Sequence, residues 1–554
     1  MFDLSLLHAP SIYDFRERTR DYGPVSDVIP STPIFEMYPI GFVSILSQLI
    51  PDGFRVKIEN LAVEMLLDKK FDVEKKIKSL NSELFSIDLH WLPHVHGALN
   101  IAKMVKKYHP NSALILGGLS STYYHMEIMK DYDFIDFILL GDTTEPFLPQ
   151  LIEQFEKNGN FESIPNLVWR ENGKLKVNKI IPPENYINEV KLDYKYFIKQ
   201  CIRNFDVKSS LPYSNWIVSP SGMTFIQKGC HHNCVICGGS KFAYQNSYFR
   251  NNVSYRSVEN VLDDLISIQE NLGVPAFVIG DIHEAGRKYE ESLLKGIKER
   301  GIEIPIMFEI FNPAPESYYI NLEKNVSEYT IEISPESSDE NVRAFAGRYY
   351  NNNGLEKTVE YAKMHGSRKM DIFFSIGISH QTRETVLNDI KYMDKMYDKY
   401  GGWIHLFTSP IAPFVDPGSL AFEMPEKFGY RIFAKTLKDH YQLLENSKSW
   451  VDSLNYETKW LSRLDIGKLS LEAGFLIAKM KKEKNLPGSD IDLEKIENFL
   501  NNISHDGANP LPRNYIGPII YDKEELVWSK NIKIKNLNCF FVNLYRNIMN
   551  ITKK

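Results

Sequence analysis

Short apolar runs alternate with amphipathic stretches over the first part of the chain. Residues 97–108 place Leu99, Ala102 and Val105 at the spacing of one helix face. Strands interleaved with helices predict an α/β fold with a doubly wound parallel sheet, which binds ligands at the carboxyl ends of its strands. We therefore expect a Rossmann-like domain in residues 1–150. Its strand candidates are residues 4–8, 54–59, 84–88, 113–116 and 134–140.

Glycines follow two of these expected strands. Gly117 and Gly118 come directly after the fourth strand, and Gly141 comes after the fifth. Because glycine has no Cβ, the backbone at these points can lie against a flat ligand. These three positions are therefore the candidate ligand contacts of the first domain.

A second alternating set fills residues 218–420. It predicts a partial (β/α)6 barrel of the TIM type, with its chemistry at the carboxyl ends of the strands. Residues 151–217 are expected to form a connector in which residues 171–173 turn a hairpin, and residues 421–554 are expected to be mostly helical. The barrel strands are expected at residues 223–227, 276–280, 305–310, 329–334, 371–376 and 403–408.

The composition narrows the class of protein further. The 554 residues carry 65 basic and 71 acidic side chains, a net charge of −6, which gives no general attraction for nucleic acid or anionic membranes. No apolar run reaches the roughly 18–20 residues that cross a bilayer, and the first residues lack the basic start of a signal peptide. We therefore expect a cytoplasmic protein without a nucleic-acid or membrane partner.

Three of the five cysteines lie close together, directly after the first expected barrel strand. Cys230, Cys234 and Cys237 have the spacing C-x3-C-x2-C. A tight loop can present three thiolates to a four-iron cluster. Three ligands on four irons leave one iron open, and that iron can chelate a substrate or cofactor. A four-iron cluster is therefore the first candidate for this loop.

Zinc is the competing metal for the same loop. It would need a fourth ligand, for which His231 or His232 could serve. Cys201 and Cys539 are isolated in the sequence and are interpreted as ordinary structural thiols. An odd cysteine count in a chain of this length argues against a disulfide framework.

The cysteine loop resembles the signature of the radical S-adenosylmethionine (SAM) superfamily. The resemblance implies an enzyme in which SAM binds the open iron and one electron cleaves it to a 5′-deoxyadenosyl radical, which takes a hydrogen atom from the substrate. Ile236, just before the third cysteine, would lie near the SAM adenine. The electron would come from a donor such as ferredoxin or flavodoxin.

Other parts of the expected barrel resemble the same family. Residues 333–339 are similar to the stretch after the fourth strand that helps to hold the SAM ribose and carboxylate, which nominates Ser334, Glu336 and Ser337. The second strand ends in Gly280-Asp281, where the family has Gly-Gly-Glu. The resemblance therefore implies that Asp281 contacts the SAM amino group.

The first domain resembles the cobalamin-binding class of this superfamily. Residues 38–41 look like the segment that opens its first helix, and Gly117-Gly118 and residues 141–145 look like two of its loops. The segment after Gly118 and Asp142 after Gly141 depart from the family pattern. The resemblance implies cobalamin. A nucleotide site or a plain interface remains an alternative, because a doubly wound sheet serves many functions.

Three functions follow as hypotheses. The first is a radical SAM enzyme with cobalamin that transfers a methyl group to an unactivated carbon. The second is a radical SAM cyclisation, oxidation or rearrangement in which the first domain binds no cobalamin. The third, of another class, is an iron-sulfur sensor or binding protein. The expected substrate is a small molecule or a peptide.

One motif is expected to mislead. Residues 281–286 match Asp-x-His-x-x-Gly, whose histidine ligates cobalt in cobalamin-dependent mutases. The match falls in the barrel, not at the end of the first strand of the doubly wound sheet, and residues 8–13 contain no such motif. A short pattern in the wrong context is weak evidence. The sequence therefore predicts that His283 is no cobalt ligand and that bound cobalamin has no protein histidine below the metal.

Overall fold

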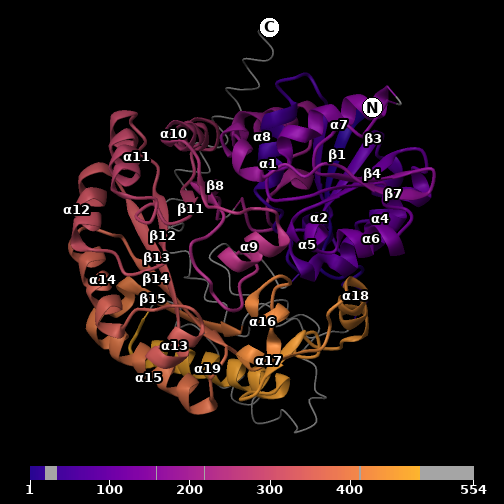
Figure 1. Cartoon of the computed structure of the whole chain (residues 1–554). Helices are drawn as coiled ribbons and strands as arrows, with labels where there is room; N and C mark the ends of the chain where they lie inside the picture. Colours follow the sequence, from indigo (N-terminus) through magenta and orange to yellow (C-terminus); the bar gives the residue numbers. More distant parts are fainter. Residues whose placement is uncertain (19–33, 158, 218, 411–413, 487–554) are drawn as a thin grey trace.

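The computed structural model describes residues 1–18, 34–157, 159–217, 219–410 and 414–486. In the first domain, the five predicted parallel strands are confirmed (Figure 1). The order is β2-β1-β3-β4-β5-β6-β7, in which β6 runs antiparallel to both β5 and β7. The strands are β1 Phe2–His8, β2 Val56–Asn60, β3 Ser82–Asp88, β4 Ala113–Gly117, β5 Phe137–Leu139, β6 Leu167–Glu171 and β7 Lys174–Val177.

The hairpin expected in the connector, β6 and β7, adds to the edge of this first sheet. The central strands are buried on both faces, with side chains alternating between the two cores, whereas the edge strand β7 stays partly exposed. On β1, Leu4 and Leu6 enter one core, and Leu7 enters the other. Helices cover both faces, and the helix predicted from the spacing of its apolar residues is α4. They are α1 Gly41–Leu49, α2 Leu61–Leu67, α3 Val73–Ser79, α4 Val95–Tyr108, α5 Leu119–Tyr123, α6 His125–Asp131 and α7 Leu148–Glu156, followed by α8 Tyr194–Asn204.

The second sheet has six parallel strands in the order β15-β14-β13-β12-β11-β8, which confirms the partial (β/α)6 barrel. Helices line its outer side (Figure 1). The strands are β8 Gly222–Phe225, β11 Ala276–Ile279, β12 Ile306–Ile310, β13 Tyr329–Glu336, β14 Met370–Ile376 and β15 Ile404–Pro410. The outer helices are α10 Val258–Ser267, α11 Arg287–Glu299, α12 Glu316–Asn325, α14 Asn352–Met364 and α15 Arg383–Tyr400.

Short elements complete the loops at the carboxyl ends of the barrel strands. They are β9 Gln227–Lys228, β10 Ser254–Tyr255, α9 Lys241–Ser247 and α13 Glu340–Phe345. The 3₁₀ segments are Leu92–His94, Glu145–Phe147, Pro183–Glu189, Lys208–Ser210 and Gly401–Trp403, and Ile268–Leu272 is a π-helical turn.

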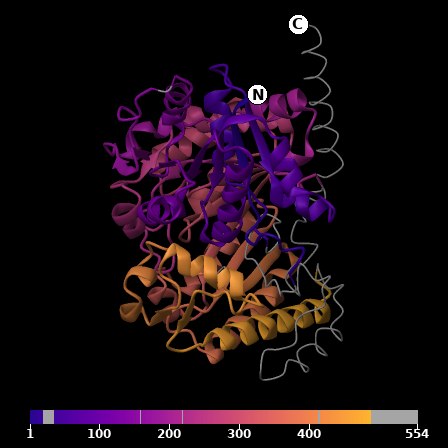
Figure 2. The ribbon, with the colours of Figure 1, turned by 90° about the vertical axis from the view of Figure 1, so that its right-hand side faces the viewer.

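The described part of the C-terminal region is mainly helical. The long helix α19 packs against α15 and β15, at the end of the molecule away from the first sheet (Figure 1, Figure 2). No described helix is long and apolar enough to cross a membrane. Cys539 lies outside the described residues. The elements are α16 Leu420–Glu423, α17 Pro425–Phe428, β16 Tyr430–Ile432, α18 Leu437–Asn446, β17 Tyr456–Thr458 and α19 Arg463–Glu483.

A buried ion pair joins the first domain to the barrel. Arg250 donates from Nε and Nη2 to the two carboxylate oxygens of Asp142, at 2.6 and 2.8 Å. Lys228 donates to the backbone oxygen of Asp142. Asp142 follows β5, whereas Lys228 and Arg250 flank the cysteine loop. The carboxyl edge of the first sheet is therefore held beside that loop.

Candidate active site

The cysteine loop follows β9 and precedes α9. Cys230, Cys234 and Cys237 are each partly buried. The amide of His232 donates to Sγ of Cys230 at 3.4 Å, and the amide of Gly239 donates to Sγ of Cys237 at 3.2 Å. Such amides stabilise negative charge on sulfur. The loop therefore presents its sulfurs in a setting suited to thiolate ligands.

The electrostatics of these thiols fit a cationic partner. Burial raises the pKa of Cys230 to about 11 and also raises the pKa of Cys234 and Cys237. Neighbouring sulfurs add to the effect at Cys230 and Cys237, and the charge of Arg348 opposes it at Cys230 and Cys234. Three thiols in this setting keep their protons unless a metal compensates the charge of the thiolates. A cluster of iron ions supplies that compensation, so the donor set fits the four-iron cluster.

The two histidines of the loop bind other groups. Nε2 of His232 lies 2.7 and 2.8 Å from the two carboxylate oxygens of Glu284, and Nε2 of His231 lies 3.0 Å from the hydroxyl of Tyr255. Among the described residues, no group of three or more His, Cys, Asp or Glu side chains is placed to hold a single metal ion. The histidines therefore anchor the loop, and the zinc alternative has no support from their geometry.

The stretch after the fourth barrel strand lies inside the barrel. Glu336 has a positive φ of 68°, and its Oε2 accepts a hydrogen bond from Ser375 Oγ at 2.5 Å. Ser337 donates to the buried carboxylate of Asp389 at 2.9 Å, so its side chain anchors the loop. Ser334 is half-buried on β13. Of the three nominated residues, only Glu336 carries a carboxylate, whose Oε1 lies 3.9 Å from Nη2 of Arg348.

Gly280 and Asp281, at the end of the second barrel strand, both have structural roles in the fold. Asp281 accepts hydrogen bonds from the amides of His283, Glu284 and Phe311 at 2.9, 3.2 and 2.8 Å, so its carboxylate shapes a turn. Gly280 has a φ of 103°, and a Cβ there would lie 2.8 Å from Ile226. The glycine is therefore required by close packing inside the barrel.

Sequence reasoning missed Glu309. Its Oε1 accepts a hydrogen bond from the amide of Gly280 at 2.5 Å, and burial raises its pKa to about 7. Its signal in the sequence is that it is the one acidic residue in the otherwise apolar strand β12. Ile236 packs against the small core of Val342, Ala346 and Ile378, and its place near the SAM adenine stays a prediction.

Histidines gather at the carboxyl edge of the first sheet, which sequence reasoning also missed. Nδ1 of His8 lies 2.8 Å from Asp88 Oδ1, and its Nε2 lies 3.0 Å from the carbonyl oxygen of Phe35. Nε2 of His94 lies 2.8 Å from the same oxygen. Burial opposes the charge of His8, but Asp88 outweighs it and raises the pKa of His8. His90 lies two residues after the end of β3.

The three glycines of this edge have different surroundings. A Cβ on Gly117 would meet no atom within 4 Å, and one on Gly141 would meet only the side chain of Asn166, at 3.8 Å. A Cβ on Gly118, whose φ is 110°, would lie 2.6 Å from Cα of His90. Gly118 is thus required by the backbone of His90, whereas a Cβ would meet open space at Gly117 and only ordinary contact with Asn166 at Gly141.

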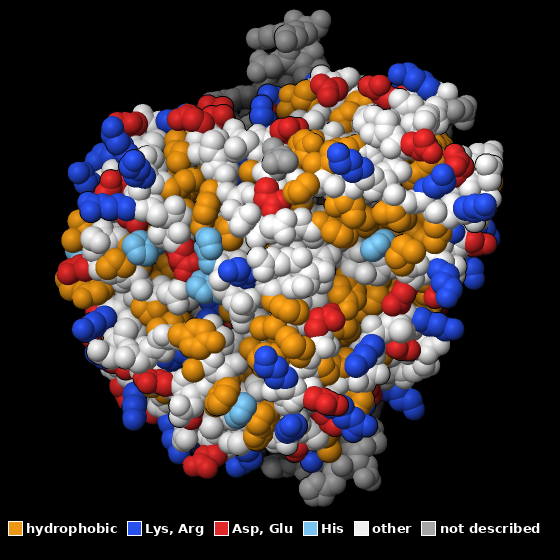
Figure 3. Space-filling model, viewed as in Figure 1, with side chains coloured by type: hydrophobic (Ala, Val, Ile, Leu, Met, Phe, Trp, Pro, Cys, Tyr) orange, Lys and Arg blue, Asp and Glu red, His pale blue; other side chains and the backbone are white. Residues whose placement is uncertain are grey.

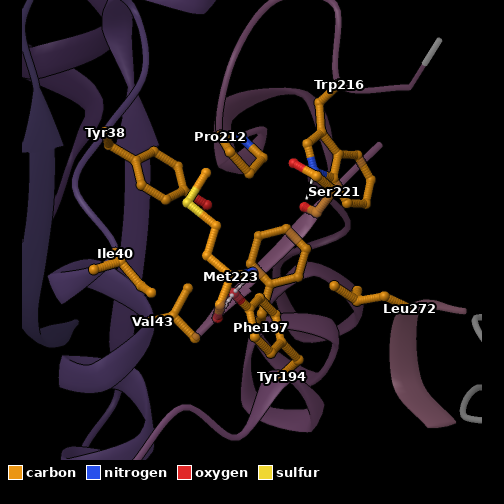
Figure 4. Close-up of a pocket in the computed structure, with 10 residues that line it drawn as sticks. All are labelled: Tyr38, Ile40, Val43, Tyr194, Phe197, Pro212, Trp216, Ser221, Met223 and Leu272. Atoms are coloured by element: carbon orange, nitrogen blue, oxygen red, sulfur yellow. Dashed lines mark hydrogen bonds between the residues drawn. The ribbon is translucent and has the colours of Figure 1, made fainter. Parts of the chain in front are cut away.

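A small apolar cavity of about 30 Å³ lies between the two domains, at the other end of the barrel from the cysteine loop. Tyr38 and Ile40 of the first-helix motif line it together with Met223 at the start of β8 (Figure 4). Tyr194 donates its hydroxyl proton to the carbonyl oxygen of Met223 at 2.8 Å. This part of the motif therefore packs the domains together and lies away from the site.

The surface has charges of both signs interspersed, and histidines gather over the barrel loops (Figure 3). No field of a single sign covers this face, in line with the small net charge.

Two family models match the chain in the order of its two sheets. The model described as the B12 binding domain matches residues 28–148, and the model described as the radical SAM superfamily matches residues 224–393. Fold and cysteine loop thus define a radical SAM protein with a B12-binding domain in front. The chain belongs to the cobalamin-binding class of the radical SAM superfamily.

Curated relatives are distant. An uncharacterized methyltransferase of Pyrococcus horikoshii is 23% identical over 365 residues, which cover 65% of this chain and 73% of the relative. Cytidylyl-2-hydroxyethylphosphonate methyltransferase of Streptomyces wedmorensis is 23% identical over 333 residues, 52% of this chain and 60% of the relative. The hopanoid C-3 methylase of Methylococcus capsulatus is 21% identical, and the match spans about half of each chain.

Solved structures share the fold. The methyltransferase TsrM from Kitasatospora setae, with cobalamin and a [4Fe-4S] cluster bound, has a TM-score of 0.57 at 12% identity, with 91% of this chain and 100% of that chain covered. OxsB, with aqua-cobalamin and S-adenosylmethionine bound, has a TM-score of 0.55 at 12% identity, with 99% and 80% covered. The likeness thus spans both domains.

Proposed function

We propose that this protein is a cobalamin-dependent radical SAM methyltransferase that acts on an unactivated carbon. The observation that carries the proposal is the buried pair of Asp142 and Arg250, which joins the carboxyl edge of the first sheet to the side of the cysteine loop. A corrinoid on that edge would therefore lie next to a cluster and SAM in the barrel. Methyltransferases among the relatives and neighbours support the same reaction.

The chain's own residues then have separate tasks. Cys230, Cys234 and Cys237 hold the cluster, and Glu336 binds SAM with its neighbours Ser334 and Ser337. Ile236 and Gly280-Asp281 complete the walls of the SAM site. Gly117 and Gly141 give room for the corrinoid on the other side, with Gly118 supporting that edge. When bound, the cluster supplies the electron that cleaves SAM, and the corrinoid supplies the methyl group.

The proposal also covers the domain limits, the location of the enzyme, its substrate class and its electron donor. We propose domain limits of 1–150, 151–217, 218–420 and 421–554. We place the enzyme in the cytoplasm, with a small-molecule or peptide substrate and an electron donor such as ferredoxin or flavodoxin. The runner-up is a radical SAM cyclisation, oxidation or rearrangement. The two differ in whether the methyl group of SAM reaches the product.

An isotope experiment separates the two reactions. Protein with reconstituted iron, reduced and supplied with cobalamin, is incubated without oxygen with cell extract and SAM whose methyl group carries deuterium. We expect a product that has gained the deuterated methyl group, as detected by mass spectrometry. Formation of 5′-deoxyadenosine with an altered but unmethylated product would favour the runner-up.

Glu336→Gln is expected to weaken SAM binding by about 10–100-fold, the range for losing a polar contact near a metal site. The iron content should stay unchanged, because Glu336 holds no iron. Isothermal titration with SAM and iron analysis of the same sample measure both. Glu384→Gln, an exposed glutamate at the start of α15, is the matched control and should change neither. Equal loss of iron and SAM binding would remove Glu336 from the SAM site.

A further inference from the structure

The chain contains two Asp-x-His sequences, at residues 281–283 and 88–90. In the barrel sequence, the carboxylate of Asp281 shapes the turn described above. Nδ1 of His283 lies 2.7 Å from Oε2 of Glu290 on α11. Both side chains therefore have structural partners, as expected for a motif in the wrong context.

The second sequence lies where a doubly wound sheet binds its ligand. The strand order β2-β1-β3 makes the β1/β3 junction the point at which the chain reverses its direction of winding, and ligands bind at the carboxyl ends of such strands. Asp88 ends β3, and His90 stands two residues beyond it. His90 is thus at the ligand-binding edge of the domain.

The backbone of His90 is held firmly. Its carbonyl oxygen accepts hydrogen bonds from the amide and the hydroxyl of Ser120 at 3.2 and 3.0 Å. Gly118 allows this approach because a Cβ there would overlap Cα of His90. A firmly placed backbone lets one side chain be presented in a defined direction.

The ring of His90 makes no hydrogen bond or ion pair with any described residue, and it is half-buried. Asp88, Lys228 and Asp142 act on the ring electrostatically, so it lies within the field of the groups that join the two domains. A neutral imidazole is a common metal ligand.

The other two histidines of this edge are less accessible to a metal ion than His90. Both ring nitrogens of His8 have partners, and His94 is 2% exposed, with Nε2 against the carbonyl oxygen of Phe35. Nδ1 of His94 and Oδ2 of Asp88 are both buried without a hydrogen-bond partner in the described structure. A carboxylate that accepts the other N–H of a metal-bound imidazole is the usual support of such a ligand.

We propose that the imidazole of His90 is an axial nitrogen ligand to the cobalt of a corrinoid bound on the first domain, with Asp88 supporting it. This inference rests on the corrinoid part of the proposed function. It replaces the sequence-based expectation of a cobalt without a protein histidine, which considered the end of β1 and the barrel motif but not the end of β3.

Electron paramagnetic resonance tests the ligand directly. Full-length protein labelled with ¹⁵N-histidine is loaded with cob(II)alamin, and corrinoid binding is first measured by absorbance. A ¹⁵N ligand splits each cobalt line into a doublet, whereas the ¹⁴N base of cobalamin itself gives a triplet. We expect the doublet in the wild type and in His283→Gln, and its loss in His90→Gln. In labelled His90→Gly, added unlabelled imidazole should restore a bound nitrogen as a triplet that is absent before the addition.

Results that contradict the role of His90 differ from results that contradict corrinoid binding. Bound corrinoid without a doublet in the wild type would overturn the assignment of His90, and so would a doublet that persists in His90→Gln. Failure of the wild type to bind any corrinoid would contradict the corrinoid part of the proposed function as well. If His90→Gln no longer retains corrinoid, the imidazole experiment on His90→Gly decides: no restored triplet would overturn the proposal.

Discussion

Replacing any one of Cys230, Cys234 and Cys237 by alanine is expected to abolish the four-iron cluster and SAM cleavage with it. The loss should exceed about 100-fold, the upper range for removing a mere supporting partner of a metal site. Each sulfur should hold a different iron, so two remaining thiolates leave two irons without a protein ligand. Iron and sulfide analysis after anaerobic reconstitution measures the cluster, and 5′-deoxyadenosine measures the cleavage.

Cys201 provides the matched control for these variants. It is 2% exposed and packs in the core, beside Gln200, whose Nε2 lies 3.3 Å from its sulfur. Cys201→Ala should keep the full iron content and the full rate of SAM cleavage. Retention of activity by any one of the three loop variants would contradict the assignment of the cluster ligands.

Arg250→Ala is expected to destabilise the protein by about 3–5 kcal/mol, the usual effect of breaking a buried ion pair. The side chains of Arg250 and Asp142 are 0% and 4% exposed, so the substitution leaves a buried carboxylate without its partner. Because this pair joins the two domains, the corrinoid affinity should fall too. Urea unfolding gives the free energy, and absorbance gives the retained corrinoid.

Arg300→Ala is the matched control for the ion pair. Arg300 lies 2.7 Å from Asp263 at the surface, where the two side chains are 29% and 68% exposed. Such pairs contribute only about 0–1 kcal/mol. A similar small effect for both arginines would show that the Asp142–Arg250 pair does not hold the domains together.

The two parallel sheets and the cysteine loop could be predicted because their signals are local. Each strand is a short apolar run, and the run that became β3 was predicted as residues 84–88, within the observed Ser82–Asp88. The three cysteines lie on one loop, so their spacing alone brings them together. The helix over residues 97–108 was likewise visible in the periodicity of its apolar face.

Features that depend on distant partners could not be predicted. The hairpin of β6 and β7 was expected, but its pairing with β5 depends on a contact that no local pattern encodes. Gly118 stays a predicted ligand contact, but its close approach to the backbone of His90, far away in the sequence, follows only from the fold. Asp281 likewise stays a predicted SAM contact, and the hydrogen bond that it accepts from the amide of Phe311, just after β12, follows only from the fold.

The cysteine loop and the barrel are expected to cleave SAM by one-electron reduction. The direct measurement is 5′-deoxyadenosine, formed by the reconstituted, reduced wild-type protein with SAM under anaerobic conditions. We expect 5′-deoxyadenosine to accumulate in the wild type and in Cys201→Ala but not in Cys234→Ala. A reconstituted wild-type protein with its full iron content that forms no 5′-deoxyadenosine, or forms as much as Cys234→Ala, would contradict it.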